Sequence, residues 1–163
     1  MSLYFSHIET PFGMAAAAVD EDGAVMEFTF LNSEMTTRLA HRDRAEHAPN
    51  RLKEVTRQVH EFFERKRTDF NLVLKPQGSP FQHKVWQALC DIPFGETWSY
   101  QQIAKAVGDI KATRAVGGAN NKNPIALIIP CHRVIGKSGT LTGYGGGLPL
   151  KQKLLDFETP SLF

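Results

Sequence analysis

Apolar residues recur with a period of two in the first part of the chain. Every second position from residue 24 to residue 30 is apolar: Ala24, Met26, Phe28 and Phe30. This run follows the turn-forming pair Asp22-Gly23, so the alternation predicts a β-strand behind a tight turn. The apolar stretch of residues 14–19 is the expected partner strand.

A helical period replaces the strand period from about residue 49 to residue 65. One side of this segment is apolar at Leu52, Val55, Val59, Phe62 and Phe63, which is the spacing of an amphipathic helix. Residues 70–74 are another short apolar run and are predicted to be a strand. Residues 75–78, Lys-Pro-Gln-Gly, have the composition of a linker. We therefore expect a small α/β domain with its linker over residues 1–78.

The second part, residues 79–163, is predicted to be mainly helical. Ser79 and Ser99 are each followed three residues later by a glutamine, so each pair can form a capping box at the start of a helix. Gly108 stands where the helix after Ser99 needs a left-handed C-cap, and a second short helix follows. Two short helices joined by a glycine-containing turn indicate a helix-turn-helix.

The pattern after these helices completes the predicted fold. Residues 125–129 are a continuous apolar run between two prolines and are predicted to be a buried strand that leads to Cys131. A glycine-rich loop covers residues 136–147, and a last helix ends near Pro160. The chain is therefore predicted to be an α+β protein, with an N-terminal α/β domain before the helical domain of residues 79–163.

Composition excludes several classes of protein. The 163 residues contain no apolar run near the about 18 that a membrane-spanning helix needs, and no secretory signal is apparent. With two cysteines, a disulfide-stapled secreted fold is not indicated and a cytoplasmic protein is expected. Residues 1–78 carry ten Lys/Arg against twelve Asp/Glu, whereas residues 79–163 carry nine against five. The basic second part favours an anionic partner such as nucleic acid.

The main chemical signal is Cys131, which is flanked by Pro130, His132 and Arg133. Burial raises the pKa of a thiol, whereas neighbouring cationic or hydrogen-bonding groups lower it and favour the nucleophilic thiolate. Because neighbouring side chains of an extended segment point to opposite sides, we expect a bridging water rather than direct contact between the sulfur and the His132 ring. A hydrogen-bonded core histidine is the competing interpretation. Cys90, on a predicted apolar helix face, is interpreted as a small buried hydrophobe.

The second helix of the predicted helix-turn-helix is rich in small residues, namely Ala112, Thr113, Ala115, Gly117, Gly118 and Ala119. Major-groove recognition helices usually carry long polar side chains. A small-residue helix instead suits close approach to a backbone or a narrow minor groove, with the single long cation, Arg114, wedged into the base stack. A tightly packed core helix is the alternative. The glycine-rich loop lacks the Gly-Lys-Ser/Thr of a phosphate-binding loop and is interpreted as a lid or pocket wall.

These motifs together resemble a known family. Residues 130–134, Pro-Cys-His-Arg-Val, with Asn123-Pro124 before them, are similar to the signature of the O6-alkylguanine-DNA alkyltransferases, also called methylated-DNA–protein-cysteine methyltransferases. Further similar motifs lie at residues 99–102, 114–118 and 143–147 and at Glu158. The resemblance implies a ribonuclease H-like N-terminal domain, a winged helix-turn-helix domain that carries the active site, and a bacterial stand-alone type.

The resemblance implies roles for individual residues. Cys131 would accept the alkyl group, His132 would act through water as its base, and Glu158 would hold and polarise His132. Asn123 would brace the active-site loop, and Tyr100 would contact the DNA and donate a hydrogen bond to the base. The residues expected at the DNA or at the damaged base are Arg114, Ala112, Thr113, Ala115, Gly117, Val134, Tyr144, Gly145 and Lys151.

The implied function is DNA repair. The thiolate would take an alkyl group from O6-alkylguanine, and from O4-alkylthymine, after the base is flipped out of the duplex. Because the thioether product is stable, each molecule would act once. The implied partner is double-stranded alkylated DNA, bound by a monomer that can cooperate along the duplex, and DNA binding should be salt-sensitive. No cofactor is implied, and no zinc is expected because residues 1–78 contain no cysteine.

Two other functions compete with this interpretation. Alkyltransferase-like proteins bind alkylated DNA without transfer, but they typically replace the acceptor cysteine, commonly with Trp, whereas Cys131 is present. A thiol hydrolase that uses Cys131 and His132 would leave Tyr100 and Arg114 unexplained. Position 145 is glycine where some family members carry serine, so the loop is predicted to admit bulkier alkyl groups.

Overall fold

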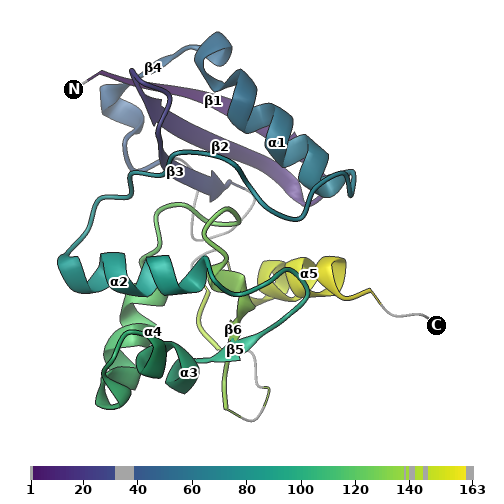
Figure 1. Cartoon of the computed structure of the whole chain (residues 1–163). Coiled ribbons are helices and arrows are strands. Elements are labelled where there is room, and N and C mark those ends of the chain that lie inside the picture. Colours follow the sequence, from purple (N-terminus) through teal and green to yellow (C-terminus); the bar gives the residue numbers. More distant parts are fainter. Residues whose placement is uncertain (1, 32–38, 138, 140–141, 145–146, 161–163) are drawn as a thin grey trace. The chain divides into compact units, whose positions relative to one another are not determined.

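The computed structural model describes residues 2–31, 39–137, 139, 142–144 and 147–160 (Figure 1). The chain forms two compact units, Met1–Gln77 with Pro124–Ile128 and Gly78–Asn123 with Ile129–Phe163. The predicted division into domains after residue 78 stays a prediction. The structure adds that the short segment Pro124–Ile128 is grouped with the first unit.

The first unit is built on a four-stranded sheet (Figure 1). Its strands, in spatial order, are β3 (Val25–Phe30), β2 (Gly13–Asp20), β1 (Leu3–Thr10) and β4 (Ala45–His47). β2 and β3 are antiparallel and confirm the predicted pair. Gly23 makes the turn between them at a φ of 85°, and the Asp20 carboxylate accepts hydrogen bonds from two backbone N–H groups of that turn. β1 and β4, which pair in parallel, have no counterpart among the predicted elements.

Helix α1 (Lys53–Phe63) packs against this sheet and follows a 3-10 turn, Pro49–Leu52 (Figure 1). The predicted apolar stripe is confirmed, because all five of its residues are buried. Burial of each large apolar side chain contributes about 1.5–3 kcal/mol to folding, so the stripe is enough to hold α1 on the sheet.

The predicted strand at residues 70–74 is wrong. This segment forms only one bridge, between Leu74 and Val25. At Asn71 the backbone N–H and carbonyl bind the side-chain amide of Gln58, at 2.8 and 3.0 Å, instead of a neighbouring strand. A buried side chain on α1 has therefore taken the place of strand pairing.

The apolar run at residues 125–129 is also not the predicted strand. It makes a single bridge between Ile125 and Phe28, and it then turns at Leu127, whose φ is 68°. All of its residues except Ala126 are buried in this compact turn, which accounts for their apolar character. Periodicity cannot distinguish a buried turn of this kind from a fully buried strand.

The second unit is mainly helical (Figure 1). Its main elements are α2 (Pro80–Leu89), β5 (Trp98–Ser99), α3 (Tyr100–Ala106), α4 (Thr113–Asn121), β6 (Val134–Ile135) and α5 (Leu148–Glu158). Both predicted capping boxes are present: Ser79 and Ser99 accept hydrogen bonds from the backbone N–H of Gln82 and Gln102, whose side chains bind the serine N–H in return. The two short strands β5 and β6 pair in parallel.

α3 and α4 are the predicted pair of short helices. The N–H groups of Gly108 and Asp109 donate to the carbonyls of Lys105 and Ala104, both at 3.0 Å, and Gly108 has a φ of 86°. This is the hydrogen-bond pattern of a glycine-terminated helix, as the sequence predicted. A 3-10 turn, Ile110–Ala112, then leads into α4.

The prediction that Cys90 is buried is wrong. Cys90 is exposed and is the C-cap residue of α2, directly after the buried Leu89. The core face of α2, which contains Val85, Trp86 and Leu89, ends with the helix at Leu89, and the residue after it is exposed.

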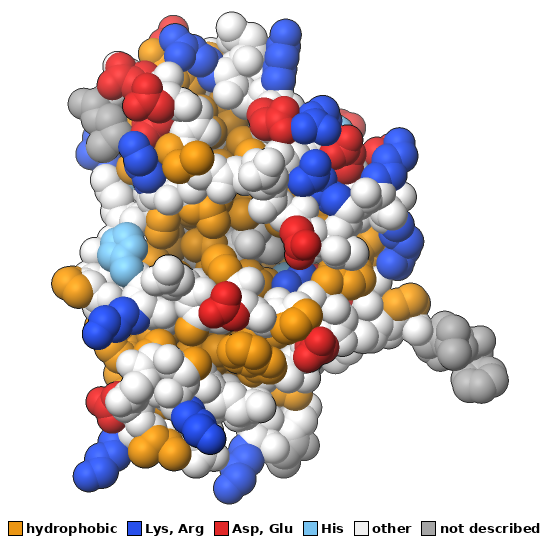
Figure 2. Space-filling model, in the orientation of Figure 1, with side chains coloured by type: hydrophobic (Ala, Val, Ile, Leu, Met, Phe, Trp, Pro, Cys, Tyr) orange, Lys and Arg blue, Asp and Glu red, His pale blue; other side chains and the backbone are white. Residues whose placement is uncertain are grey.

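The architecture is mixed, with a small sheet covered by a helix in one unit and packed helices in the other. No helix within the described ranges is long and apolar enough to cross a membrane. Figure 2 shows basic side chains at the end of the second unit that carries α3 and α4. Exposed cations on these helices and the turn between them include Lys105, Lys111 and Arg114.

Candidate active site

Cys131 begins a 3-10 turn, Cys131–Arg133. The expectation of an extended segment is wrong here, because the N–H of Cys131 donates to the Ile129 carbonyl at 2.7 Å and the N–H of Arg133 donates to the Pro130 carbonyl at 3.0 Å. The argument that neighbouring side chains point to opposite sides therefore does not apply. Cys131 is 5% exposed, and burial raises the pKa of its thiol to about 11. The resting thiol keeps its proton at neutral pH and needs a base.

His132 is completely buried, and its Nε2 lies 2.7 Å from Oε2 of Glu158. Burial lowers the pKa of His132 against the opposing effect of Glu158, so the ring is neutral at neutral pH. A neutral imidazole that meets a carboxylate carries its proton on the facing nitrogen. Nδ1 is then unprotonated, and it has no hydrogen-bond partner among the residues that the structure describes. A general base needs this state of the ring.

Glu158 is held by a residue that sequence reasoning did not single out, Arg133. The Arg133 Nε and Nη2 donate to the two carboxylate oxygens at 2.7 and 2.9 Å, and Nη1 donates to the Ile92 carbonyl at 2.7 Å. Burial by itself raises the pKa of Glu158, but the hydrogen bonds from His132 and Arg133 outweigh it and lower this pKa to about 2. The available signal was an arginine directly before the apolar pair Val134-Ile135, since a buried arginine needs a carboxylate partner.

Two asparagines brace the turn that carries the thiol. Asn123 donates to the Ile129 carbonyl at 2.8 Å, and its hydrogen bond with Cys131 lowers the thiol pKa against the larger effect of burial. Asn120, buried on α4, donates to the Cys131 carbonyl at 3.5 Å. The position of Asn123 fits the bracing role that the resemblance implied. Asn120 was missed, although a polar residue on the apolar side of α4 beside Val116 was a signal.

Lys151, on α5, is completely buried and binds the segment before that helix. Its Nζ donates to the Thr142 carbonyl at 2.6 Å, and the Thr142 hydroxyl donates to the Tyr100 hydroxyl at 2.9 Å. Burial lowers the pKa of Lys151 to about 8 against the opposing effect of Cys131. Lys151 in turn lowers the pKa of the Cys131 thiol. The ammonium group is therefore placed where it favours the thiolate.

The remaining predicted residues at the base lie around the same turn. Tyr144 is buried, its hydroxyl has no partner within the described part of the chain, and burial raises its pKa well above the ordinary value. Its hydroxyl is thus a protonated donor. Val134 is buried in β6, where it pairs with Trp98. Gly145 lies outside the described residues.

α4 has a core face and a small-residue face. Val116, Ala119 and Asn120 are buried, so the alternative of a packed core helix holds for that side. Arg114, Ala115 and Gly118 are exposed, and Ala112, Thr113 and Gly117 are half-buried. A Cβ added at Gly118 would meet no atom within 4 Å, and one at Gly117 would make only ordinary contact with the Tyr100 ring. Packing within the chain therefore requires neither glycine.

Among the described residues, no group of three or more His, Cys, Asp or Glu side chains is placed to hold a metal ion. The polar groups around Cys131 bind one another instead, as the pairing of Glu158 with His132 and Arg133 shows.

A buried thiol beside a histidine that is bound to a carboxylate is the arrangement of a protein that uses a cysteine as its nucleophile. The pair of short helices lies in the same unit. A sequence profile described as the DNA-binding domain of 6-O-methylguanine DNA methyltransferase matches residues 80–160. The chain is 44% identical over 162 residues to the methylated-DNA–protein-cysteine methyltransferase of Methanosarcina barkeri, covering 98% of this chain and 99% of that protein. It is 43% identical over 161 residues to the constitutive enzyme of that name from Bacillus subtilis, covering 95% and 94%.

Solved structures agree with these sequence matches. The O6-methylguanine methyltransferase of Mycobacterium tuberculosis superposes with a TM-score of 0.87 at 40% identity, covering 96% of this chain and 92% of that one. The M. tuberculosis protein crystallised in complex with DNA superposes with a TM-score of 0.85 at 39% identity, covering 95% and 92%. The chain belongs to the methylated-DNA–protein-cysteine methyltransferase family.

Proposed function

We propose that this chain repairs DNA by transferring an alkyl group from O6-alkylguanine, and from O4-alkylthymine, to its own Cys131, once per molecule. The observation that carries the proposal is the buried thiol of Cys131 next in sequence to His132, whose ring is bound to Glu158 at 2.7 Å. Two observations favour transfer over the lesion-binding alternative. The relatives are named as methyltransferases, and the acceptor cysteine, Cys131, is present.

The chemistry follows from the protonation states. The Cys131 thiol, protonated at rest, gives its proton through one water to Nδ1 of His132, and Glu158 stabilises the imidazolium that forms. The sulfur then attacks the alkyl carbon, the S–C bond forms, and the C–O6 bond breaks with its electron pair going to guanine. The guanine anion takes up one proton, which balances the proton that the thiol gave to His132. The products are unmodified guanine and S-alkylcysteine, which has no easy route back to the thiol.

DNA binding is proposed for the small-residue face of α4. Because packing within the chain does not require Gly117 or Gly118, the absence of side chains there suits close approach to a minor groove. Arg114, exposed on the same helix, would fill the gap left by the flipped base, and Tyr100 would contact the DNA beside it. The side chains of Lys151 and Tyr144 would act on the guanine and the thiolate as donors.

The finer description of the fold belongs to the same proposal. The helix pair α3 and α4 with the short β5–β6 ladder supports a winged helix-turn-helix domain. The sheet order β3-β2-β1-β4 with α1 supports a ribonuclease H-like domain. We further propose a cytoplasmic monomer that can bind cooperatively along DNA.

A single-turnover labelling experiment tests the function. The protein is mixed with excess duplex that carries one O6-methylguanine, and its intact mass is followed. The expected result is a gain of one methylene unit per chain, abolished by Cys131→Ala and kept by the matched control Cys90→Ala. Tight binding without a mass change would support a lesion-binding protein. Repeated release of an acyl product from an added ester, without stable labelling of the protein, would support a hydrolase.

The same assay tests substrate size. Because residue 145 is glycine, we propose that O6-benzylguanine duplexes also react. Rates on O6-methyl and O6-benzyl duplexes are compared, and a block on the larger adduct would contradict this part.

A further inference from the structure

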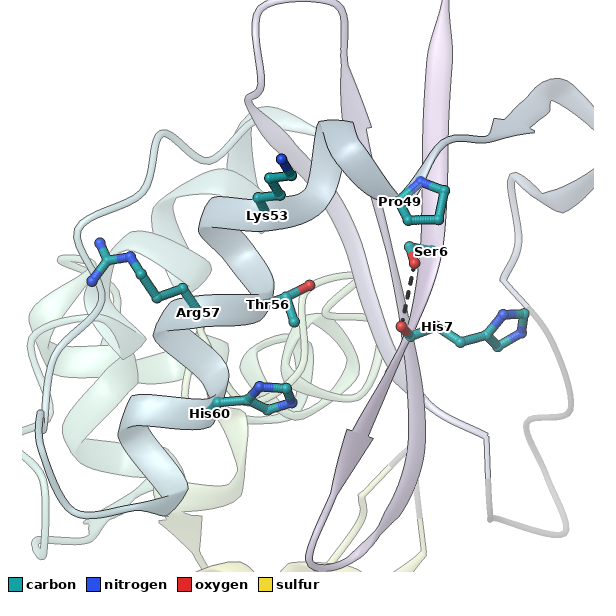
Figure 3. Close-up of a pocket in the computed structure, with 7 residues that line it drawn as sticks. All are labelled: Ser6, His7, Pro49, Lys53, Thr56, Arg57 and His60. Carbon is teal, nitrogen blue, oxygen red and sulfur yellow. Dashed lines mark hydrogen bonds between the residues drawn. The ribbon is translucent and has the colours of Figure 1, made fainter.

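A groove of about 410 Å³ lies in the first unit, between β1 and α1 (Figure 3). Its lining comes from one side of α1 with the turn before it and from the middle of β1. The lining residues are Ser6, His7, Pro49, Lys53, Thr56, Arg57 and His60. The proposed repair reaction uses none of them.

The groove lies along an edge of the sheet that, among the residues the structure describes, no strand covers beyond Phe5. β4 pairs with β1 only at Leu3, Tyr4 and Phe5, and the last contact on that side is the Ala48 N–H, which donates to the Phe5 carbonyl at 3.0 Å. Backbone groups of alternate residues in an antiparallel strand point to the same side. His7 and Glu9 therefore direct their N–H and carbonyl groups to this edge, beyond the end of β4.

Of these four backbone groups, the two carbonyls accept hydrogen bonds from side chains. The His7 carbonyl accepts a hydrogen bond from the Ser6 hydroxyl at 3.3 Å, and the Glu9 carbonyl accepts one from Nε2 of His60 at 3.1 Å. The N–H groups of His7 and Glu9 have no partner among the described residues. Residues two apart in a strand are separated by about 7 Å, so two free donors stand at the spacing of carbonyls in a neighbouring strand.

Basic side chains line the groove. Lys53, Arg57 and two histidines contribute to its lining, and none of the seven lining residues is acidic. Arg57 is already paired with Glu54 and Glu61, whereas Lys53 has no ion-pair partner within the described ranges. In Figure 3, Thr56 and His60 point from α1 toward the strand. A ligand in the groove would therefore meet polar groups on its helix side and N–H donors on its strand side.

We propose that this open edge of β1 binds an extended, acidic peptide segment of a partner protein as an added strand. Addition of a strand to a sheet edge is an established mode of peptide recognition, in which main-chain hydrogen bonds contribute affinity and alternate side chains contribute specificity. The two free donors match the carbonyls of such a peptide. Its alternate side chains face α1, where Lys53 favours carboxylates. The volume of the groove suits a segment of only a few residues.

The test uses the full chain and a defined probe. The probe is a seven-residue peptide of alternating Glu and Thr, capped at both ends, and the matched control replaces each Glu by Lys. Backbone amide shifts are followed by NMR during the titration. The expected result is saturable movement of the His7 and Glu9 amide signals with the acidic peptide and none with the basic one.

Two variants separate edge pairing from charge. His7→Pro removes one edge donor at a position where a sheet edge tolerates proline, and we expect it to abolish the titration. Lys53→Glu places a like charge in the groove, and we expect it to weaken binding by about five-fold. The control, Lys66→Glu, changes an exposed lysine just after α1 and should leave the affinity unchanged. All three variants are checked for alkyl transfer, because retained transfer shows that the chain is folded.

Three results would overturn the proposal. One is equal binding of the basic peptide. Another is movement of the His7 and Glu9 amides with unmodified duplex DNA but not with the acidic peptide, which would make the groove a nucleic-acid contact. The third is movement of these amides with protein concentration alone, which would make the edge a contact between copies of the chain.

Discussion

Two arginines, one in each unit, form the same kind of ion pair in opposite surroundings. Arg57 on α1 binds Glu54 and Glu61, and its side chain is 53% exposed. Arg133 binds both oxygens of Glu158, and these two side chains are 7% and 1% exposed. Water screens the first cluster, whereas the second has only its own partners to compensate its burial. The same contacts are therefore replaceable on α1 and indispensable beside Cys131.

This contrast also explains the chemistry of each region. In the buried cluster the carboxylate orients His132 and leaves Nδ1 of the ring unprotonated. On α1 the ion pairs of Arg57 remain in solvent, and the cationic character of the groove rests on Lys53, which has no ion-pair partner in the described part of the chain. Burial makes the protonation states of the paired groups depend on one another, whereas exposure leaves the charges of Arg57 and its partners screened by water.

The largest expected effect comes from breaking the buried pair. Glu158→Gln leaves Arg133 buried without its counter-charge, so we expect the free energy of unfolding to fall by about 3–5 kcal/mol. The rate of transfer should fall by about 10²-fold or more, because His132 loses the group that supports its charged form. Urea unfolding and single-turnover mass measurements check both. The matched variant is Glu61→Gln on the surface cluster, and an equal loss of stability there would contradict the comparison.

Acid should weaken the same pair without any mutation. The pKa of Glu158 is about 2 in the folded chain against 4.5 ordinarily. A carboxyl group with a lowered folded-state pKa contributes stability that is complete above its unfolded pKa and is lost as the pH falls through the folded one. This corresponds to about 3 kcal/mol lost between pH 5 and pH 2. Urea unfolding at several pH values measures it, and Glu158→Gln should show a smaller loss over the same range.

A smaller effect is expected from Lys151. Its pKa is about 8, so raising the pH through 8 removes a charge that favours the thiolate. With increasing pH, the transfer rate should first rise, because His132 loses its proton on leaving the acid range. It should then level off, and above pH 8 it should fall by about ten-fold. Lys151→Met should lower the plateau and remove the alkaline decrease. An unchanged alkaline limb in this variant would show that another group titrates there.

The smallest effect is expected at the exposed arginine. Arg57→Met removes both surface ion pairs but keeps a long side chain on α1. Because solvent already screens these charges, the midpoint of thermal unfolding should stay within measurement error, and so should transfer. A decrease comparable to that of Glu158→Gln would mean that exposure is not what separates the two clusters.

Local sequence signals predicted much of the fold. The capping serines, Ser79 and Ser99, and Gly108 act through hydrogen bonds within a few residues, so their neighbours determine the outcome. The apolar stripe on α1 could also be predicted, because the helical spacing of its apolar residues indicates which face is buried. Predictions failed where a distant partner intervened. Gln58 binds the backbone of Asn71 in place of a strand, and the left-handed turn at Leu127 bends an apolar run that looked extended.

The candidate site divides in the same way. By itself, the sequence singled out Cys131 and His132 as the candidate reactive pair, because a thiol and an imidazole stand side by side directly after Pro130. It also determined where α2 and α3 begin and where α3 ends. The tertiary structure decided that Arg133 holds Glu158 and that Nδ1 of His132 is left bare. These features depend on side chains about 25 residues apart in sequence, and only their burial together makes their charges and protonation states depend on one another.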